Sequence, residues 1–108
     1  GIVRMNLNQS TDTTISETTA ERVAELFATL ADPSRVRIVA ALTAGEMHVG
    51  ALAVAVGISE SAVSHHLRLL RQMRLVRTHK DGRYVFYMLD DTHVADLFRC
   101  GVEHVQHG

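Results

Sequence analysis

Apolar side chains recur every three or four positions in the first half of the chain, and this spacing predicts amphipathic helices. Thr18 and Glu21 fit a capping box at the start of the first helix, which we expect to end near Ala31. Asp32 followed by Pro33 is typical of an N-cap and a first helical residue, so a second helix is predicted to begin there. The apolar positions of these two helices are Val23, Leu26, Phe27 and Leu30, then Val36, Ile38, Val39 and Leu42.

Two shorter helices are predicted next. The first spans about 49–56 and ends at Gly57, and Ser59 caps the second. Two helices joined by so short a turn form a helix-turn-helix, and residues 59–72 are called the recognition helix below. Its expected buried positions are Val63, Leu67 and Leu70.

The last third of the chain begins with a different pattern. Segments 76–80 and 83–89 are strand-like and flank Asp81-Gly82, a dipeptide that is favoured in hairpin turns. A final helix is predicted over about 92–107. Its apolar positions are Val94, Leu97, Phe98, Val102 and Val105. Together the elements predict a mainly α fold with a β-hairpin, which is a winged helix-turn-helix.

Length and composition limit the other possibilities. A chain of 108 residues is one small domain, and we expect a flexible N-terminal arm over 1–17 and the folded domain over 18–108. No apolar run approaches the ~20 residues that cross a bilayer. The single cysteine, Cys100, excludes an internal disulfide and a cysteine-cluster zinc site, and it favours a reducing, cytoplasmic compartment. We expect Cys100 to be a small buried hydrophobe.

The charge is unevenly distributed, although the net charge is only −1. Residues 61–83 hold six Lys and Arg against one acid, whereas the rest of the chain holds five against eleven. A basic middle is typical of a surface that binds a polyanion, and a solvated helix face is the alternative. In a winged helix-turn-helix the recognition helix lies in the major groove, and the hairpin, or wing, approaches the backbone. The candidate DNA contacts are therefore Ser59, Ser61, Ser64, His65 and Arg68 on the recognition helix, and Arg77, Lys80 and Arg83 on the wing.

Three segments resemble the ArsR/SmtB family of metal-sensing repressors: ESAVSHHLRLLRQMRLV (60–76), LADPSRVRIVAAL (30–42) and KDGRYVFYML (80–89). The resemblance implies a homodimeric repressor, not an enzyme, that binds an inverted-repeat operator when metal-free. It further implies release of the operator on metal binding, and a hydrogen bond from a ligand histidine to backbone near the end of the recognition helix that transmits the signal.

Four possible metal ligands lie in or next to the predicted last helix: Asp91, His93, His104 and His107. At about 100° per residue, His93 and His104 share one helix face to within ~20°. Eleven residues of helix nevertheless rise roughly 16 Å, whereas metal–ligand bonds are about 2 Å long. One chain therefore cannot surround one ion with all four groups.

Two antiparallel copies of this helix remove the difficulty. Asp91 and His93 of one chain would meet His104 and His107 of the other, and two-fold symmetry would create two equal sites. The last helix is then predicted to form a dimer interface. Because residues two apart do not face each other within a helix, Asp91 must lie at or before the N-cap.

Three imidazoles and a carboxylate favour Zn²⁺ in a closed tetrahedron. The spacing is similar to that of the interhelical zinc site in the zinc-responsive SmtB/CzrA-like branch of the family. Nickel and cobalt sensors on this scaffold add ligands from the tails; residues 1–17 contain no histidine and the sequence stops at Gly108, so we expect zinc, with Co²⁺ or Ni²⁺ as the alternative. A further ligand beyond Gly108 would favour that alternative.

The other histidines are interpreted more simply. The thiolate-rich second site of the family corresponds to EMHVGAL (46–52), where His48 stands at an expected cysteine, and we expect His48 to be a surface residue. Of the adjacent His65 and His66, one should face DNA and the other should pack. His79 is expected to contact phosphate or solvent.

The expected mechanism is that zinc joins the two last helices and favours a dimer whose recognition helices no longer match the ~34 Å of one DNA turn. Sensing should weaken as pH falls through the histidine range. A zinc hydrolase is disfavoured because no HExxH occurs and four protein ligands leave no place for water. The remaining alternatives are a DNA-binding regulator that does not respond to metal and a metal-buffering protein.

Overall fold

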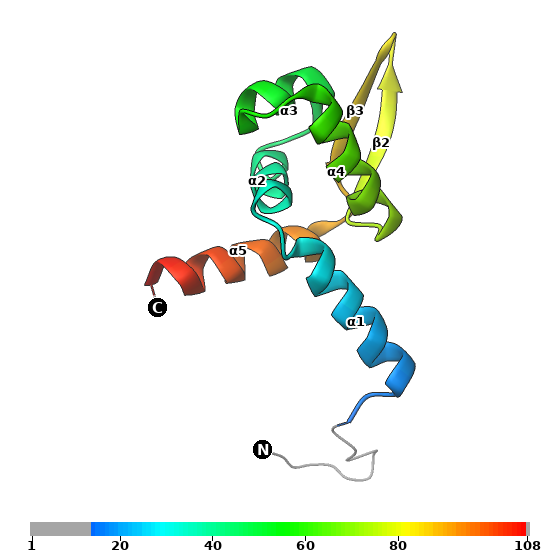
Figure 1. Ribbon diagram of the computed structural model, residues 1–108, viewed down its shortest axis with the longest axis vertical. Helices are drawn as coiled ribbons and strands as arrows, with labels where there is room; N and C mark the ends of the chain where they lie inside the picture. The colour runs from blue at the N-terminus through cyan, green and yellow to red at the C-terminus, as the bar shows by residue number, and fades with distance from the viewer. Residues whose placement is uncertain (1–13, 108) are drawn as a thin grey trace.

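The computed structural model describes residues 14–107, so most of the predicted arm, residues 1–13, lies outside the described part. The elements of the described part are α1 (Glu17–Leu30), α2 (Pro33–Leu42), β1 (Met47–His48), α3 (Val49–Val56), α4 (Glu60–Gln72), β2 (Val76–Asp81), β3 (Tyr84–Leu89) and α5 (Thr92–His107). Figure 1 shows α2, α3 and α4 grouped beside the β2–β3 hairpin, with α1 and α5 at the opposite end of the molecule from the hairpin tip. This arrangement confirms the predicted winged helix-turn-helix.

Capping side chains set the starts of the first two helices. The N-cap of α1 is Ser16, whose hydroxyl accepts the backbone N–H of Thr19 at 3.1 Å. The prediction of a cap at Thr18 is therefore wrong by two residues, because Glu17 already favours the helical first turn electrostatically. Asp32 caps α2 as predicted, since its Oδ1 accepts the N–H of Arg35 at 3.1 Å.

The helix-turn-helix follows its predicted boundaries. Gly57 ends α3 in the left-handed conformation with φ of 79°, which glycine adopts without a steric penalty. Ser59 caps α4 by accepting the N–H of Ala62 at 3.1 Å. The turn after α4 contains Arg74, which has a positive φ of 57° although it is not glycine.

The sheet differs from the prediction in two ways. The hairpin loop is Gly82-Arg83 and not Asp81-Gly82, because Asp81 pairs with Tyr84 and Gly82 takes the positive φ of 64° at the first loop position. A third strand, β1, pairs antiparallel with β3 and places His48 opposite Phe86. Two residues are too few to show an alternating pattern, so the sequence alone did not reveal β1.

One hydrophobic core holds the domain together. Its members come from α2, α3, α4 and the start of the wing: Ile38, Val39, Leu42, Leu52, Val56, Val63, Leu67, Leu70, Leu75 and Val76. Neither α1 nor α5 contributes a buried residue, although both have apolar faces. The core thus fixes α4 and the wing firmly, while α1 and α5 retain uncovered apolar surface. None of the helices in residues 14–107 has the length and hydropathy of a membrane-spanning segment.

Candidate nucleic-acid interface and metal site

The buried side of α4 determines what its other side presents. Val63, Leu67 and Leu70 are at most 1% exposed and hold the helix on the core. The candidate contacts on α4 all lie on exposed positions: Ser61, Ser64, His65 and Arg68. Ser59 is also exposed; its oxygen caps the helix, and its hydroxyl lies 3.3 Å from that of Ser61. The packing therefore leaves one polar face of α4 free for a ligand.

A guanidinium links α4 to the helices behind it. Arg35 donates from Nε to the carbonyl of Thr29 at 2.6 Å, and its NH1 lies 3.3 Å from Nδ1 of His66. His66 is half-buried, whereas its neighbour His65 is exposed. The two adjacent histidines thus have different roles: His66 packs and orients α4, and His65 is available at the surface.

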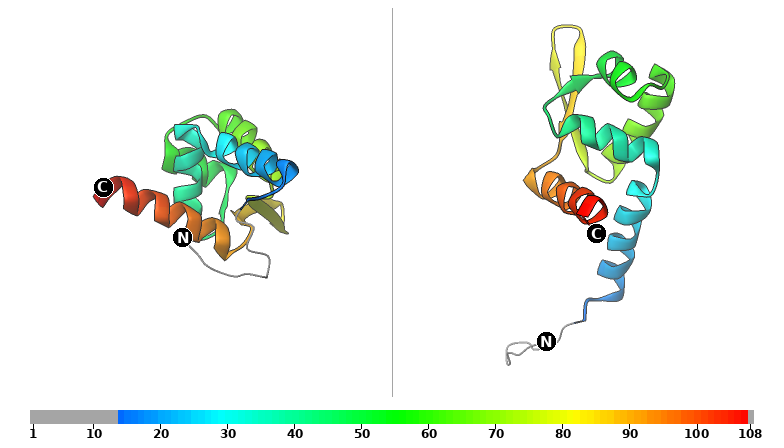
Figure 2. Two further views of the ribbon diagram at one scale, coloured as in Figure 1. Left: turned by 90° about the horizontal axis from the view of Figure 1, so that it is seen from below. Right: turned by 90° about the vertical axis from the view of Figure 1, so that its left-hand side faces the viewer.

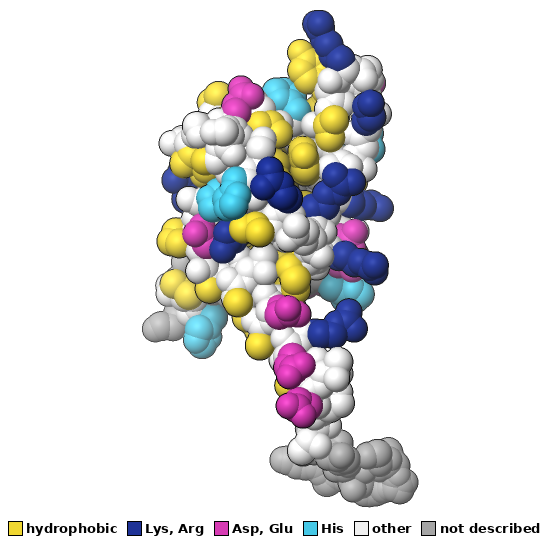
Figure 3. All heavy atoms as spheres, turned by 45° about the vertical axis from the view of Figure 1, so that its right-hand side comes forward, with side chains coloured by type: hydrophobic (Ala, Val, Ile, Leu, Met, Phe, Trp, Pro, Cys, Tyr) yellow, Lys and Arg dark blue, Asp and Glu magenta, His cyan; other side chains and the backbone are white. Residues whose placement is uncertain are grey.

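The wing carries exposed cations. Arg77 and Lys80 are exposed on β2, and the guanidinium of Arg83 lies 5.9 Å from the ring centre of Tyr84 at the hairpin turn. Figure 3 shows Lys and Arg side chains gathered along one edge of the molecule, from the hairpin tip down to the level of α1. Cations on this edge and the polar face of α4 give the surface the chemistry that binds a phosphate backbone.

Two histidines have structural roles that the sequence did not indicate. His79 is exposed, as its expected contact with phosphate or solvent requires, but its Nδ1 also lies 3.0 Å from Oε1 of Glu46 and its ring stacks on Phe86 with 5.6 Å between centres. His48 was expected at the surface but is half-buried, and its Nδ1 accepts the N–H of Ala51 at 3.3 Å as the N-cap of α3. The nitrogen that caps α3 is already occupied, which argues against His48 as a metal ligand.

The N-terminal end of α5 brings two metal-ligating side chains together. Asp91 precedes the helix, and its Oδ1 accepts the N–H of Val94 at 3.1 Å. Its Oδ2 lies 3.5 Å from Nδ1 of His93. The hydrogen bond from Val94 and, next among the favourable contacts, the nearby His93 lower the pKa of the Asp91 carboxyl, so Asp91 is a carboxylate at neutral pH. The required position of Asp91 outside the helix is confirmed.

The spacing of these two donors fits a tetrahedral metal ion. With bonds of about 2.0–2.1 Å, neighbouring donors of a tetrahedral zinc site lie about 3.3–3.4 Å apart. The 3.5 Å between Oδ2 of Asp91 and Nδ1 of His93 is close to that value. His93 is 91% exposed and Asp91 is 49% exposed, so the pair is open to a further ligand.

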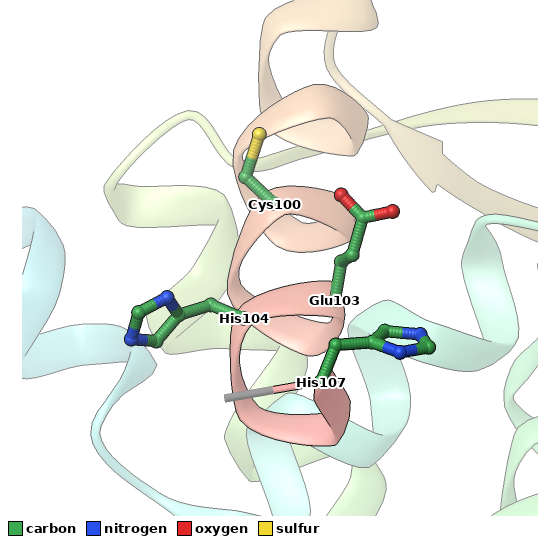
Figure 4. A pocket seen from close by; sticks show the side chains of 4 residues that line it. All are labelled: Cys100, Glu103, His104 and His107. Carbon is green, nitrogen blue, oxygen red and sulfur yellow. The ribbon is translucent and has the colours of Figure 1, made fainter.

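The C-terminal end of α5 carries the other two histidines. Figure 4 shows a hollow lined by Cys100, Glu103, His104 and His107, with the two imidazole rings directed to different sides of the helix. Cys100 is exposed, so the expectation of a small buried hydrophobe is wrong for the single chain. The cause is that Cys100 lies on the side of α5 that the core leaves uncovered.

One chain does not assemble a complete metal site. Residues 14–107 contain no group of three or more His, Cys, Asp or Glu side chains that could hold an ion. The Asp91–His93 pair and the His104–His107 pair belong to opposite ends of a helix of 16 residues. A site with all four donors would therefore need a second copy of the chain.

An apolar groove runs beside the C-terminal donors. It lies between α1 and α5, has a volume of about 760 Å³, and includes His104 in its lining. Phe27 of α1 is 52% exposed and Val105 of α5 is 80% exposed, although both are large hydrophobic residues. Exposed apolar surface of this kind marks an interaction site in soluble proteins.

Sequence reasoning counted Arg71 and Arg74 in the basic middle but not among the candidate DNA contacts. Both are exposed, one in the last turn of α4 and the other in the turn that follows. The charge pattern was the signal that could have included them.

The chain resembles known regulatory proteins. Residues 32–78 match the sequence pattern of the protein family described as "Bacterial regulatory protein, arsR family". The "Transcriptional repressor SmtB homolog" of Synechocystis sp. is 51% identical over 81% of this chain and 66% of its own length. The "HTH-type transcriptional regulator NmtR" of Mycobacterium tuberculosis is 44% identical over 82% of this chain and 73% of its own length. A solved homodimeric winged helix-turn-helix DNA-binding domain of Mycobacterium bovis superimposes with a TM-score of 0.75 at 29% identity, covering 90% of this chain and 96% of that one.

Proposed function

Because the chain belongs to the ArsR family of bacterial regulatory proteins, we propose that it is a metal-responsive transcriptional repressor that releases operator DNA when zinc binds between two subunits. The observation that carries the proposal is the Asp91–His93 pair, whose donor atoms lie 3.5 Å apart at the exposed end of α5. A pair of donors satisfies half of a tetrahedral site, so the other half has to come from elsewhere.

The partner in this proposal is a second copy of the chain. The groove between α1 and α5 exposes large apolar side chains, and burying each of them would contribute about 1.5–3 kcal/mol. The similar domain of Mycobacterium bovis is homodimeric, which supports the same assembly here. With α5 antiparallel to its copy, Asp91 and His93 would face the partner's His104 and the partner's His107.

The DNA-binding part of the proposal rests on α4 and the wing. A two-fold dimer presents two recognition helices, which matches an operator built as an inverted repeat. Ser61, Ser64, His65 and Arg68 would approach base edges from the exposed face of α4, with Ser59 at its N-terminus. Arg77, Lys80 and Arg83 would bind phosphates. A regulator of this kind acts in the cytoplasm, where the DNA is.

The donor set suits Zn²⁺ better than a soft ion, because it consists of three imidazoles and one carboxylate with no thiolate. When bound, zinc would supply a rigid cross-link between the two subunits. Asp91 is already ionised at neutral pH, so only the histidines would have to be neutral for binding. Four protein donors leave no open position, which agrees with a regulator and not an enzyme.

A mixed-dimer experiment tests the shared site. His93→Gln and His104→Gln each damage both sites of a homodimer, so neither variant alone should bind zinc tightly. Refolded together, they form mixed dimers in which one site carries both substitutions and the other carries none. We expect the mixture to recover one tight zinc site per mixed dimer. A site confined to one subunit would recover nothing, and that result would refute the proposal.

The choice of metal is tested on operator-bound protein by fluorescence anisotropy. Zinc should release the DNA at a lower free concentration than cobalt or nickel, and His104→Gln should abolish the release. Cobalt-loaded protein should have a tetrahedral visible spectrum without thiolate charge transfer, and Cys100→Ser should leave it unchanged. Release by nickel or cobalt at lower free metal would favour a sensor of those ions, and DNA binding unchanged at saturating metal would favour a regulator that does not respond to metal.

A further inference from the structure

We propose that Arg71 and Arg74 bind DNA phosphates and extend the contact surface across the turn between α4 and the wing; this inference rests on the proposed DNA-binding function. The candidate contacts above stop at Arg68 on α4 and begin again at Arg77 on β2. Arg71 and Arg74 lie between these two positions in the chain. With them, exposed basic residues run along the chain from α4 into the wing.

The basic residues of this region follow a constant interval. From α4 through the turn and β2 to the hairpin loop, every third residue is basic: Arg68, Arg71, Arg74, Arg77, Lys80 and Arg83. All six are exposed. None of them belongs to the ion pairs found within residues 14–107, which involve only His79, His93 and Arg99 as cations. The six cations are thus left without carboxylate partners in the part of the chain that the structure describes.

The backbone at Arg74 gives independent support. Arg74 has φ of 57°, and the N–H of Leu75 reaches back to the carbonyl of Leu70 at 2.9 Å, which is the hydrogen bond of a Schellman motif. Glycine is the usual residue at this position, because a Cβ makes the left-handed conformation unfavourable. Arginine is therefore a poor choice for the fold itself. Its side chain is exposed and belongs to none of the ion pairs found within residues 14–107, so a role outside the chain accounts for its presence.

The position of the turn suits a phosphate contact. The turn joins the two elements that carry the candidate DNA contacts, and Figure 3 shows the cations continuing along this edge from the hairpin tip toward α1. A duplex that follows the edge would meet positive charge along its whole length. In a two-fold dimer each contact is present twice, so the effect of one substitution is doubled.

Arg71 also has a structural reason to be basic. It lies in the last turn of α4, where a cation interacts favourably with the helix dipole. Arg74 lies beyond the helix and has no such reason. Arg74 is therefore the position at which a DNA contact and a structural role predict opposite effects of substitution on the melting temperature.

The test measures how binding depends on salt. A labelled random-sequence duplex of about 30 base pairs, long enough for a dimer, is titrated with metal-free full-length protein at several salt concentrations. Arg74→Gly should decrease the slope of log K against log salt by about 2 per dimer, since each lost phosphate contact contributes about 0.9. At about 0.1 M salt its affinity should fall at least fivefold. Its melting temperature should be unchanged or higher, because glycine suits the backbone.

Two further variants complete the experiment. Arg74→Lys should keep the wild-type slope, and Arg71→Ala should decrease it as Arg74→Gly does. The matched control is Arg99→Ala, which removes the same charge from α5, where Arg99 pairs with Asp96 at 3.1 Å, and it should leave the slope unchanged. Equal slopes for wild type and Arg74→Gly would overturn this proposal while leaving the zinc-responsive repressor intact. Loss of affinity together with a lower melting temperature would also overturn it, in favour of a structural role, as would a wild type that binds no duplex.

Discussion

The backbone N–H of Asp90 donates a hydrogen bond to the carbonyl of Leu75 at 3.0 Å. Leu75 follows the turn that ends α4 and is buried in the core, whereas Asp90 immediately precedes Asp91 at the start of α5. One hydrogen bond therefore joins the turn after the recognition helix to the start of α5, which carries the candidate metal donors. The resemblance to metal-sensing repressors implies a bond from a ligand histidine to backbone near the end of the recognition helix, and the Asp90–Leu75 bond is a backbone connection between the same regions.

Zinc binding should reduce opening of this hydrogen bond. If Asp91 is held by a metal ion, the adjacent Asp90 loses mobility, and we expect exchange of its amide hydrogen to slow by about tenfold or more. Hydrogen exchange followed by NMR on metal-free and zinc-loaded protein measures the effect, and His104→Gln should abolish it. If zinc releases the DNA while exchange at Asp90 is unchanged, the Asp90–Leu75 hydrogen bond does not transmit the effect of zinc to the recognition helix.

A charge in the apolar groove should dissociate the dimer without unfolding the chain. Val105→Asp puts a carboxylate at a position that is 80% exposed in one chain and covered in the proposed dimer. We expect sedimentation at micromolar concentration to give a monomer with unchanged helical content and weaker operator binding. Val54→Asp is the matched control, because Val54 is 84% exposed on α3, away from the groove, and this variant should remain dimeric. A dimeric Val105→Asp protein would count against the interface.

The carboxylate of Asp32 should make stability depend on pH in the acid range. The hydrogen bond from the N–H of Arg35 lowers the pKa of Asp32 below its ordinary 3.8, so the folded state favours the charged form. Its stabilising contribution is present above the unfolded pKa and is lost as pH falls through the folded pKa. Asp32→Asn keeps a capping side chain but removes the charge. Thermal melts should show the variant less stable than wild type at pH 7 and equal to it at the acid end, and a constant difference would contradict the prediction.

Removing a core side chain from α4 should destabilise the whole domain. Leu67 is 1% exposed, so Leu67→Ala leaves a cavity and should cost about 2–5 kcal/mol of unfolding free energy. Chemical denaturation of the dimer at fixed concentration measures it. Val54→Ala on neighbouring α3 removes an exposed side chain and should change stability by about 0.5 kcal/mol at most. Similar losses for both would mean that α4 is not anchored by this core.

The sequence predicted the helices that have strong local signals. Gly57 and Ser59 define the turn of the helix-turn-helix through their own backbone and side-chain preferences, and the structure has the predicted ends of α3 and α5. The same is true of Asp91, whose place before α5 followed from the need to meet His93. These features depend on neighbouring residues in the chain, so they can be predicted from a single sequence.

Features that depend on tertiary contacts were not predictable in this way. The strand Met47–His48 exists because β3 pairs with it, and His48 is half-buried for the same reason. The hairpin loop lies one residue later than predicted, since glycine takes the first loop position and not the second. Cys100 is exposed because it lies on the side of α5 that the core leaves uncovered. Periodicity identifies an apolar face but not the molecule that covers it.

The pairing of β1 with β3 also separates two properties: the DNA contact of one subunit depends on its tertiary fold, and the relative position of two subunits depends on their interface. Since β1 leads directly into α3 and pairs with the wing, the helix-turn-helix and the hairpin are fastened into one unit. The tertiary fold therefore determines how one subunit contacts its half-site, whereas the dimer contact determines the spacing between the two recognition helices. In evolution, substitutions could therefore change the DNA contact of each subunit without changing the spacing of the two subunits, or the reverse.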